Sequence, residues 1–213
     1  MRFRRLTATN PAPRSAAERG QGLVEFAIMV PLFLVMLLGM LELGFAFNHQ
    51  LTLQYASREG ARIGADLVNG GGTSPACTTV DETIIEAVDR ILLSSGSPIP
   101  LSQISQVRIF QADSSGNDTL GRGDNWTYSA SAYPLNDGTT VNFKPVSSTW
   151  NPCTRSNQVS HTYANAVDSI GVSIKYTYKL TTPLAGAMKL IGGQYAATIP
   201  MTDDTVMQLN PTN

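Results

Sequence analysis

The segment ERGQGLVEFAIMVPLFLVMLLGMLELGFAF, residues 18–47, is one of the most apolar parts of the chain and decides how the chain is organised. Residues 26–41 carry no charge, and after Glu42 the sequence is apolar again to the end of the segment. As a helix, residues 26–47 would be about 33 Å long, which is enough to cross a bilayer. Glu25, just inside its start, needs a reason, because a charge costs ~2.5–3.5 kcal/mol at the centre of a membrane helix and less near an interface.

Positive charge is concentrated ahead of this segment. Residues 1–20 contain five arginines and one acidic side chain, whereas the whole chain has a net charge of −1. The positive-inside rule therefore predicts a cytoplasmic N-terminus, with the rest of the chain outside the cytoplasm. The overall charge gives no indication of nucleic-acid binding.

Three interpretations of the N-terminal region compete. A cleaved secretory signal has a shorter apolar core, followed by a cleavage site with small residues, for which residues 44–46 are a weak match. A plain signal anchor fits the apolar length but gives no reason for Glu25. The third interpretation, a prepilin-type leader, accounts for the glutamate.

The motif RGQGLVEFA, the apolar helix after it and LQYASREGARIGA resemble the TadE-like pseudopilins of the tight-adherence (Tad/Flp) pilus system. Type IV prepilins are similar at the same place, with a basic leader, a glycine, four residues and then a glutamate. The resemblance covers residues 19–64 and implies cleavage by a prepilin peptidase between Gly20 and Gln21. Glu25 then becomes the fifth mature residue, and its pairing with Phe26 is typical of this subfamily.

This resemblance implies a role for Glu25. Residues four apart are neighbours on a helix, so Glu25 can meet the new α-amine of Gln21 or that of an adjacent subunit. Leaving a charge unpaired at a membrane boundary is unfavourable, which favours docking beside another processed subunit. The alternative is an interfacial glutamate with no partner role.

The function implied is that of a minor pilin or pseudopilin in the structure or assembly of a bacterial tight-adherence pilus or secretion apparatus. The expected partners are the membrane, other pilin or pseudopilin subunits, the pilus assembly platform and the prepilin peptidase, with no nucleic acid and no cofactor. The protein is expected to cross the bacterial cytoplasmic membrane once, with its head outside, or to enter a surface pilus. The alternative is an uncleaved, signal-anchored periplasmic or surface binding domain. An enzyme is not expected.

The expected fold class is α+β, with a long N-terminal transmembrane helix that continues into a pilin-like head with an antiparallel sheet. The domains are a basic leader (1–20), a transmembrane helix (21–47) and an extracytoplasmic head (48–213). One helix is expected over residues 23–68, with a bend at Pro31.

The outer half of this helix has a stripe of apolar and small residues at a spacing of three to four. Small residues allow a close approach of backbones, so we expect a sheet or helix of the same subunit to lie tightly over the stripe, with an intersubunit contact as the alternative. The stripe consists of Leu53, Ala56, Gly60, Ile63, Gly64 and Leu67.

In the rest of the head the sequence predicts two helices and several strands. A helix over 79–96 would begin with a capping box formed by Thr79 and Glu82. Alternation over 172–180 predicts a strand with one covered face. A strand is expected at 106–110, followed by a long loop at 113–163. This loop would contain short strands at 126–129 and 141–143 and a hairpin turn at 136–139. A short helix is expected at 182–193, and one or two final strands with Pro200 at an edge.

Two cysteines, Cys77 and Cys153, lie in polar loops outside the expected membrane segment. We expect one disulfide between them, and two free thiols are the alternative. No Cys/His cluster has the spacing of a metal site.

The sequence carries no catalytic motif, and His49 and His161 have no recognisable partner. Calcium binding and an RGD motif at 122–124 are weak possibilities beside an ordinary turn-rich surface loop. The acidic and amide residues considered for calcium are Asp113, Asn117, Asp118 and Asp124, which do not match an EF-hand.

Overall fold

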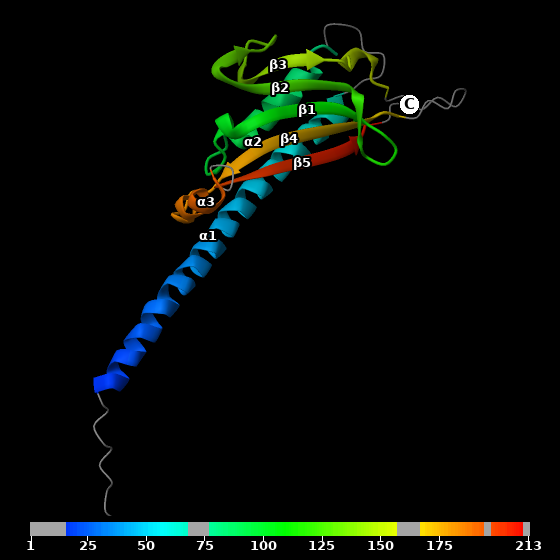
Figure 1. Ribbon diagram of the computed structural model, residues 1–213. Helices are drawn as coiled ribbons and strands as arrows, with labels where there is room; N and C mark the ends of the chain where they lie inside the picture. The colour runs from blue at the N-terminus through cyan, green and yellow to red at the C-terminus, as the bar shows by residue number, and fades with distance from the viewer. Residues whose placement is uncertain (1–15, 68–76, 157–166, 194–196, 211–213) are drawn as a thin grey trace, which may run out of the picture. The chain divides into compact units, whose positions relative to one another are not determined.

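The computed structural model describes residues 16–67, 77–156, 167–193 and 197–210 (Figure 1). The expected leader up to residue 15, the helix stop at 69–72 and His161 lie outside the described residues. The chain divides into two compact units, residues 1–41 and 42–213, which we describe separately.

The described part of the first unit, residues 16–41, is helical. Helix α1 runs over Ala16–Leu67, and Pro31 lies inside it. The stretch Gly20–Leu67 is the one helix among the described residues that is long and apolar enough to cross a membrane. Its most apolar window has a mean hydropathy of 2.4, and no residue of that window is buried. A single N-terminal apolar helix of this kind is consistent with a single-pass membrane protein.

The second unit begins at Glu42 and contains a five-stranded antiparallel sheet in the order β3-β2-β1-β4-β5. Helix α2 (Val80–Leu92) and the outer part of α1 share one hydrophobic core with the sheet. The strands and the third helix are β1 (Ile104–Ala112), β2 (Asp118–Pro134), β3 (Thr140–Ser148), β4 (Ser169–Lys179), β5 (Thr198–Gln208) and α3 (Leu184–Gly192). The α+β class, with its long apolar helix and antiparallel sheet, is confirmed.

The apolar residues of β4 recur at every second position and face the core. In β4, the residues that the sequence predicts on the covered face are buried, from Val172 to Tyr178. Next to β4, the edge strand β5 contains Pro200, which pairs with Thr177 in the Cα register. A proline lacks the backbone donor that an inner strand needs, so its position at the sheet edge follows.

The small stripe of α1 packs within the same subunit. Leu53 and Ala56 are fully buried, and a Cβ atom on Gly64 would lie 2.7 Å from Cδ1 of Ile170. Ile63 is partly buried. Leu67 is 40% exposed, so its predicted packing is wrong. It is the last residue of α1.

The long loop predicted over 113–163 is wrong for residues 118–148, which form the β2–β3 hairpin. The short strands predicted at 126–129 and 141–143 are confirmed as parts of β2 and β3, and residues 157–163 lie outside the described residues. Two register shifts in this pair, one next to Trp126 and one between Tyr128 and Tyr133, break the alternation that identifies a strand in sequence. The turn predicted at 136–139 is confirmed: Leu135 N–H donates to the Thr139 carbonyl at 2.9 Å.

The capping box predicted at the start of α2 is also wrong. Thr79 is the N-cap residue, but its side chain forms no capping hydrogen bond. The Glu82 carboxylate instead accepts hydrogen bonds from the backbone N–H and Nδ2 of Asn136, at 3.0 and 2.6 Å. Further along α2, Asp89 accepts from the backbone N–H of Asn142 at 3.2 Å. These carboxylates fasten the β2–β3 hairpin to the helix rather than capping it.

Candidate functional sites

The proposed processing motif lies on the exposed start of α1. Gly20, Gln21, Glu25 and Phe26 are all helical and exposed. Nε2 of Gln21 donates to Oε1 of Glu25 at 3.1 Å, one helical turn away. The two residues that the sequence pairs are therefore in contact through the Gln21 side chain, and pairing of Glu25 with an α-amine stays a prediction. A Cβ atom on Gly20 would meet no atom within 4 Å.

The second glutamate of the apolar segment has a different environment. Glu42 is 4% exposed, and its Oε1 accepts hydrogen bonds from the Tyr178 hydroxyl at 2.5 Å and the Thr181 N–H at 2.9 Å. Its Oε2 accepts from the Thr182 N–H at 3.0 Å. A buried carboxylate needs such donors, because its desolvation is costly. Glu42 thus holds the chain between β4 and α3 against α1, which the sequence analysis missed.

A buried histidine, His49, lies about two turns further along α1. Nδ1 of His49 lies 2.8 Å from the Tyr176 hydroxyl, which donates to Oε1 of Gln103 at 2.9 Å. Burial lowers the pKa of His49 and raises the pKa of Tyr176 to about 12. Both rings are therefore uncharged at neutral pH, and they join α1, β4 and the segment before β1 as neutral hydrogen-bonding groups.

Polar side chains also join α1 to the edge strand β5. The hydroxyl of Ser57, which is fully buried, donates to Oδ2 of Asp203 and lies 2.8 Å from Oγ1 of Thr205. Gln50 reaches Oδ1 of the same aspartate at 3.4 Å. This polar seam accounts for an aspartate on the covered face of β5, where alternation alone predicts an apolar residue.

The most deeply buried charge of the head is Arg155. Its Nη1 lies 2.7 Å from Oδ1 of Asp81, and its Nη2 donates to Oδ2 of Asp124 at 3.0 Å. The guanidinium also lies 4.2 Å from the ring centroid of Trp150. Burial raises the pKa of Asp81 to about 7, and the charge of Arg155 opposes this shift. The second carboxylate on the same guanidinium, Asp124, adds to the rise. The sequence gives no signal for this cluster, because its members lie far apart in the chain.

The disulfide between Cys77 and Cys153 is confirmed, with a Cα–Cα distance of 5.0 Å. It joins the segment before α2 to the turn Pro152–Thr154, and Arg155 follows this turn directly. The covalent bond and the buried ion cluster therefore fasten the same loop to α2.

The residues considered for calcium do not form one site. Asp113 closes its own turn by accepting from the N–H groups of Ser115 and Asn117. Asp118 is paired with Arg108 at 2.6 Å. Asp124 is 2% exposed and bound to Arg155, so the carboxylate of the RGD motif is not accessible. No group of three or more His, Cys, Asp or Glu residues with metal-binding geometry occurs in the described ranges.

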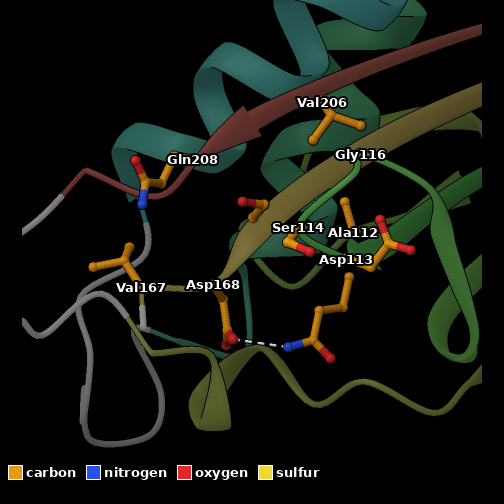
Figure 2. Close-up of a pocket in the computed structure, with 10 residues that line it drawn as sticks. Ala112, Asp113, Ser114, Gly116, Val167, Asp168, Val206 and Gln208 are labelled. Atoms are coloured by element: carbon orange, nitrogen blue, oxygen red, sulfur yellow. Dashed lines mark hydrogen bonds between the residues drawn. The ribbon is translucent and has the colours of Figure 1, made fainter. Parts of the chain in front are cut away.

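An open depression of about 560 Å³ lies where β1 ends and β4 begins (Figure 2). Asp168, on its wall, accepts from Nε2 of Gln111 at 2.7 Å and from the backbone N–H of Ser156 at 2.8 Å. Both oxygens of this carboxylate are thus occupied by the chain itself. Among the described residues that line the depression, none is a histidine, cysteine or lysine.

The comparison with known families concerns the N-terminal quarter of the chain. A family model described as TadE-like protein matches residues 20–62. The match begins at Gly20, includes Glu25 and extends past Gly60, so the resemblance carried by these residues is confirmed. The sheet lies outside it. No curated protein and no solved structure matches the chain.

Proposed function

We propose that this protein is a pseudopilin-type subunit of a tight-adherence pilus system, cleaved after Gly20 and held by α1 in the membrane until it docks with other subunits. The TadE-like segment indicates involvement in such a system. The role we assign is structural or in assembly, without catalysis and without a cofactor. Its head would lie outside the cytoplasm, in keeping with the arginines before α1 and the disulfide of the head.

The observation that carries the proposal is the placement of the two glutamates of the apolar helix. Glu42 is bound inside the head by three hydrogen-bond donors, so its presence is explained within one subunit. Glu25 is exposed, and its one described hydrogen bond is to the neutral side chain of Gln21. A carboxylate in this position is suited to a cationic partner from outside the described contacts, and a processed α-amine is such a partner.

Substitution of Glu25 by Gln tests the docking step. The variant keeps the size and much of the hydrogen bonding of the side chain but removes its charge. It should insert into the membrane and be cleaved, because neither step depends on the pair. Crosslinking to other pilin subunits and pilus assembly should fall on the order of tenfold or more, corresponding to ~1–3 kcal/mol for a broken, partly buried pair.

Glu59→Gln is the matched control, because it makes the same change on the same helix. Glu59 forms surface pairs with Arg62 and Arg90, which contribute little. Wild-type crosslinking and piliation in the Glu25→Gln strain would contradict the proposal and favour a membrane-anchored binding domain.

A further inference from the structure

Helix α3 is apolar but lies on the surface of the head. Leu190 is 89% exposed and Met188 is 39% exposed, while Lys189 is the charged residue of the helix. A surface helix of a soluble protein normally turns such side chains toward its core. Exposed apolar side chains that are grouped together mark contact with another protein or with a membrane.

The position of α3 is fixed by Glu42. The two N–H groups bound by this carboxylate belong to Thr181 and Thr182, which directly precede the N-cap residue Pro183. Glu42 follows Leu41 in the chain, where the apolar part of α1 that has no buried residue ends and the head begins. Within the head, the residues just before α3 are therefore hydrogen-bonded to Glu42, which directly follows the apolar part of α1.

Other exposed apolar residues surround this attachment. Leu43 and Phe47 on α1 are 57% and 67% exposed, and Ile199 at the start of β5 is 37% exposed. These three residues line a shallow apolar depression of about 230 Å³ together with Ala46, Gln50 and Met201. Figure 1 shows α3 at the same end of the sheet, where β4 ends and β5 begins. Three elements thus contribute to one apolar end of the head.

The exposed charges at this end are basic, because the carboxylate of Glu42 is buried and hydrogen-bonded. Residues 176–202 contain Lys179 and Lys189 and no acidic residue, and residues 43–57 contain no acidic or basic residue other than His49. Lysine can lay its aliphatic stem on an apolar surface while its ammonium group reaches lipid phosphates. A second copy joined through the same surface would instead bring like charges together without acidic partners.

We propose that α3 is a lipid-contacting helix that lies in the interfacial region of the bilayer from which α1 emerges. Leu190 and Met188 enter the boundary of the acyl chains, and Lys189 remains at the headgroups. The head then has a second attachment to the membrane besides α1, held in place by Glu42. This inference goes beyond the proposed function and requires only that α1 spans the bilayer.

Tryptophan quenching in vesicles tests this placement with the full chain. The two native tryptophans, Trp126 and Trp150, are buried and give a constant background. The test variant is Leu190→Trp. The matched control is Leu120→Trp, because Leu120 is 83% exposed and lies at the opposite end of the sheet from α3. Leu120 is close to Asp118 on β2, which pairs with Ala112, the last residue of β1. The first residue of β1, Ile104, instead pairs with Tyr176, near the end of β4 that leads to α3. Phe33→Trp, in the middle of the apolar part of α1, reports insertion itself.

In phosphatidylcholine vesicles with brominated acyl chains, the added fluorescence of Leu190→Trp and Phe33→Trp should be quenched and that of Leu120→Trp should not. Aqueous acrylamide should give the reverse order. Quenching of Phe33→Trp alone, with Leu190→Trp as accessible to acrylamide as Leu120→Trp, would overturn the inference but leave the membrane anchor intact. Failure of Phe33→Trp to be quenched would contradict both. Protection of Leu190→Trp from both quenchers, lost at a tenfold lower protein-to-lipid ratio, would show that a second copy covers α3 and would also overturn the inference.

Discussion

Gly60 of α1 lies directly against Val88 of α2: a Cβ atom on the glycine would be 2.8 Å from Cγ2 of the valine. The same atom would lie 3.5 Å from Cγ1 of Val172 on β4. One glycine therefore sets the distance at which helix, helix and sheet meet. The contact is between elements of the same subunit, so this part of the stripe is used in folding and is not available for assembly.

Gly60→Leu should consequently destabilise the head. The added side chain must displace Val88 or Val172, and overpacking of this kind typically costs ~1–3 kcal/mol. Gly44→Leu is the matched control on the same helix, because a Cβ atom there meets nothing within 4 Å. Urea unfolding of the full chain in detergent, followed by the fluorescence of the buried Trp126 and Trp150, measures the difference. Equal midpoints for the two variants would contradict the packing.

The cluster around Arg155 should make stability depend on pH. Because burial raises the pKa of Asp81 above its value in the unfolded chain, the folded state binds more protons between about pH 4 and pH 7. The free energy of unfolding contributed by this group therefore falls as the pH rises through that interval. The fall is on the order of a few kcal/mol at most.

Asp81→Asn removes this titration but keeps a side chain that can accept a hydrogen bond from Arg155. Between pH 4 and pH 7, its free energy of unfolding should fall less, or rise more, than that of the wild type. The lowered pKa of His49 acts in the opposite direction in both proteins, since an unfolded histidine gains a proton below about pH 6.5. The difference between the two curves therefore isolates Asp81, and parallel curves would contradict the assignment.

Loss of the disulfide should cost stability and weaken the ion cluster at the same time. The bond closes a loop with a sequence separation of 76 residues, and its removal typically costs ~2–4 kcal/mol. Since Arg155 follows Cys153 by two residues, the effects of Cys77→Ser/Cys153→Ser and Arg155→Ala should not be additive. Unfolding of the disulfide variant, the arginine variant and their combination measures the coupling. Strict additivity would show that the two devices act independently.

The elements that could be predicted from the sequence are those with an uninterrupted period. The apolar run of α1, the small stripe and the alternation of β4 each follow one rule over many residues, and the two loop cysteines had only each other as partners. The turn of the β2–β3 hairpin and the middle of its strands were predicted, but the length of the strands was missed because register shifts interrupt the period of two. Glu82 and Asp89 on α2 accept hydrogen bonds from this hairpin. In the sequence they have the pattern of solvent-exposed helix residues, so these tertiary contacts could not be predicted.

The polar groups inside the head were beyond prediction for a related reason. Glu42 binds residues about 140 positions away, and Arg155 binds Asp81 across 74 positions. Neither pair leaves a local spacing in the sequence. For Leu67 the periodicity was continued to the last residue of the helix, whose side chain is exposed.

The mature N-terminus of the protein tests the central claim most directly. The full-length gene is expressed in pilus-producing cells that contain a prepilin peptidase, and the membrane-extracted protein is analysed by N-terminal sequencing and intact mass. Our account predicts a chain that begins at Gln21, and an uncut chain for Gly20→Val in the same cells. A wild-type protein that still begins at Met1 in these cells would contradict the account.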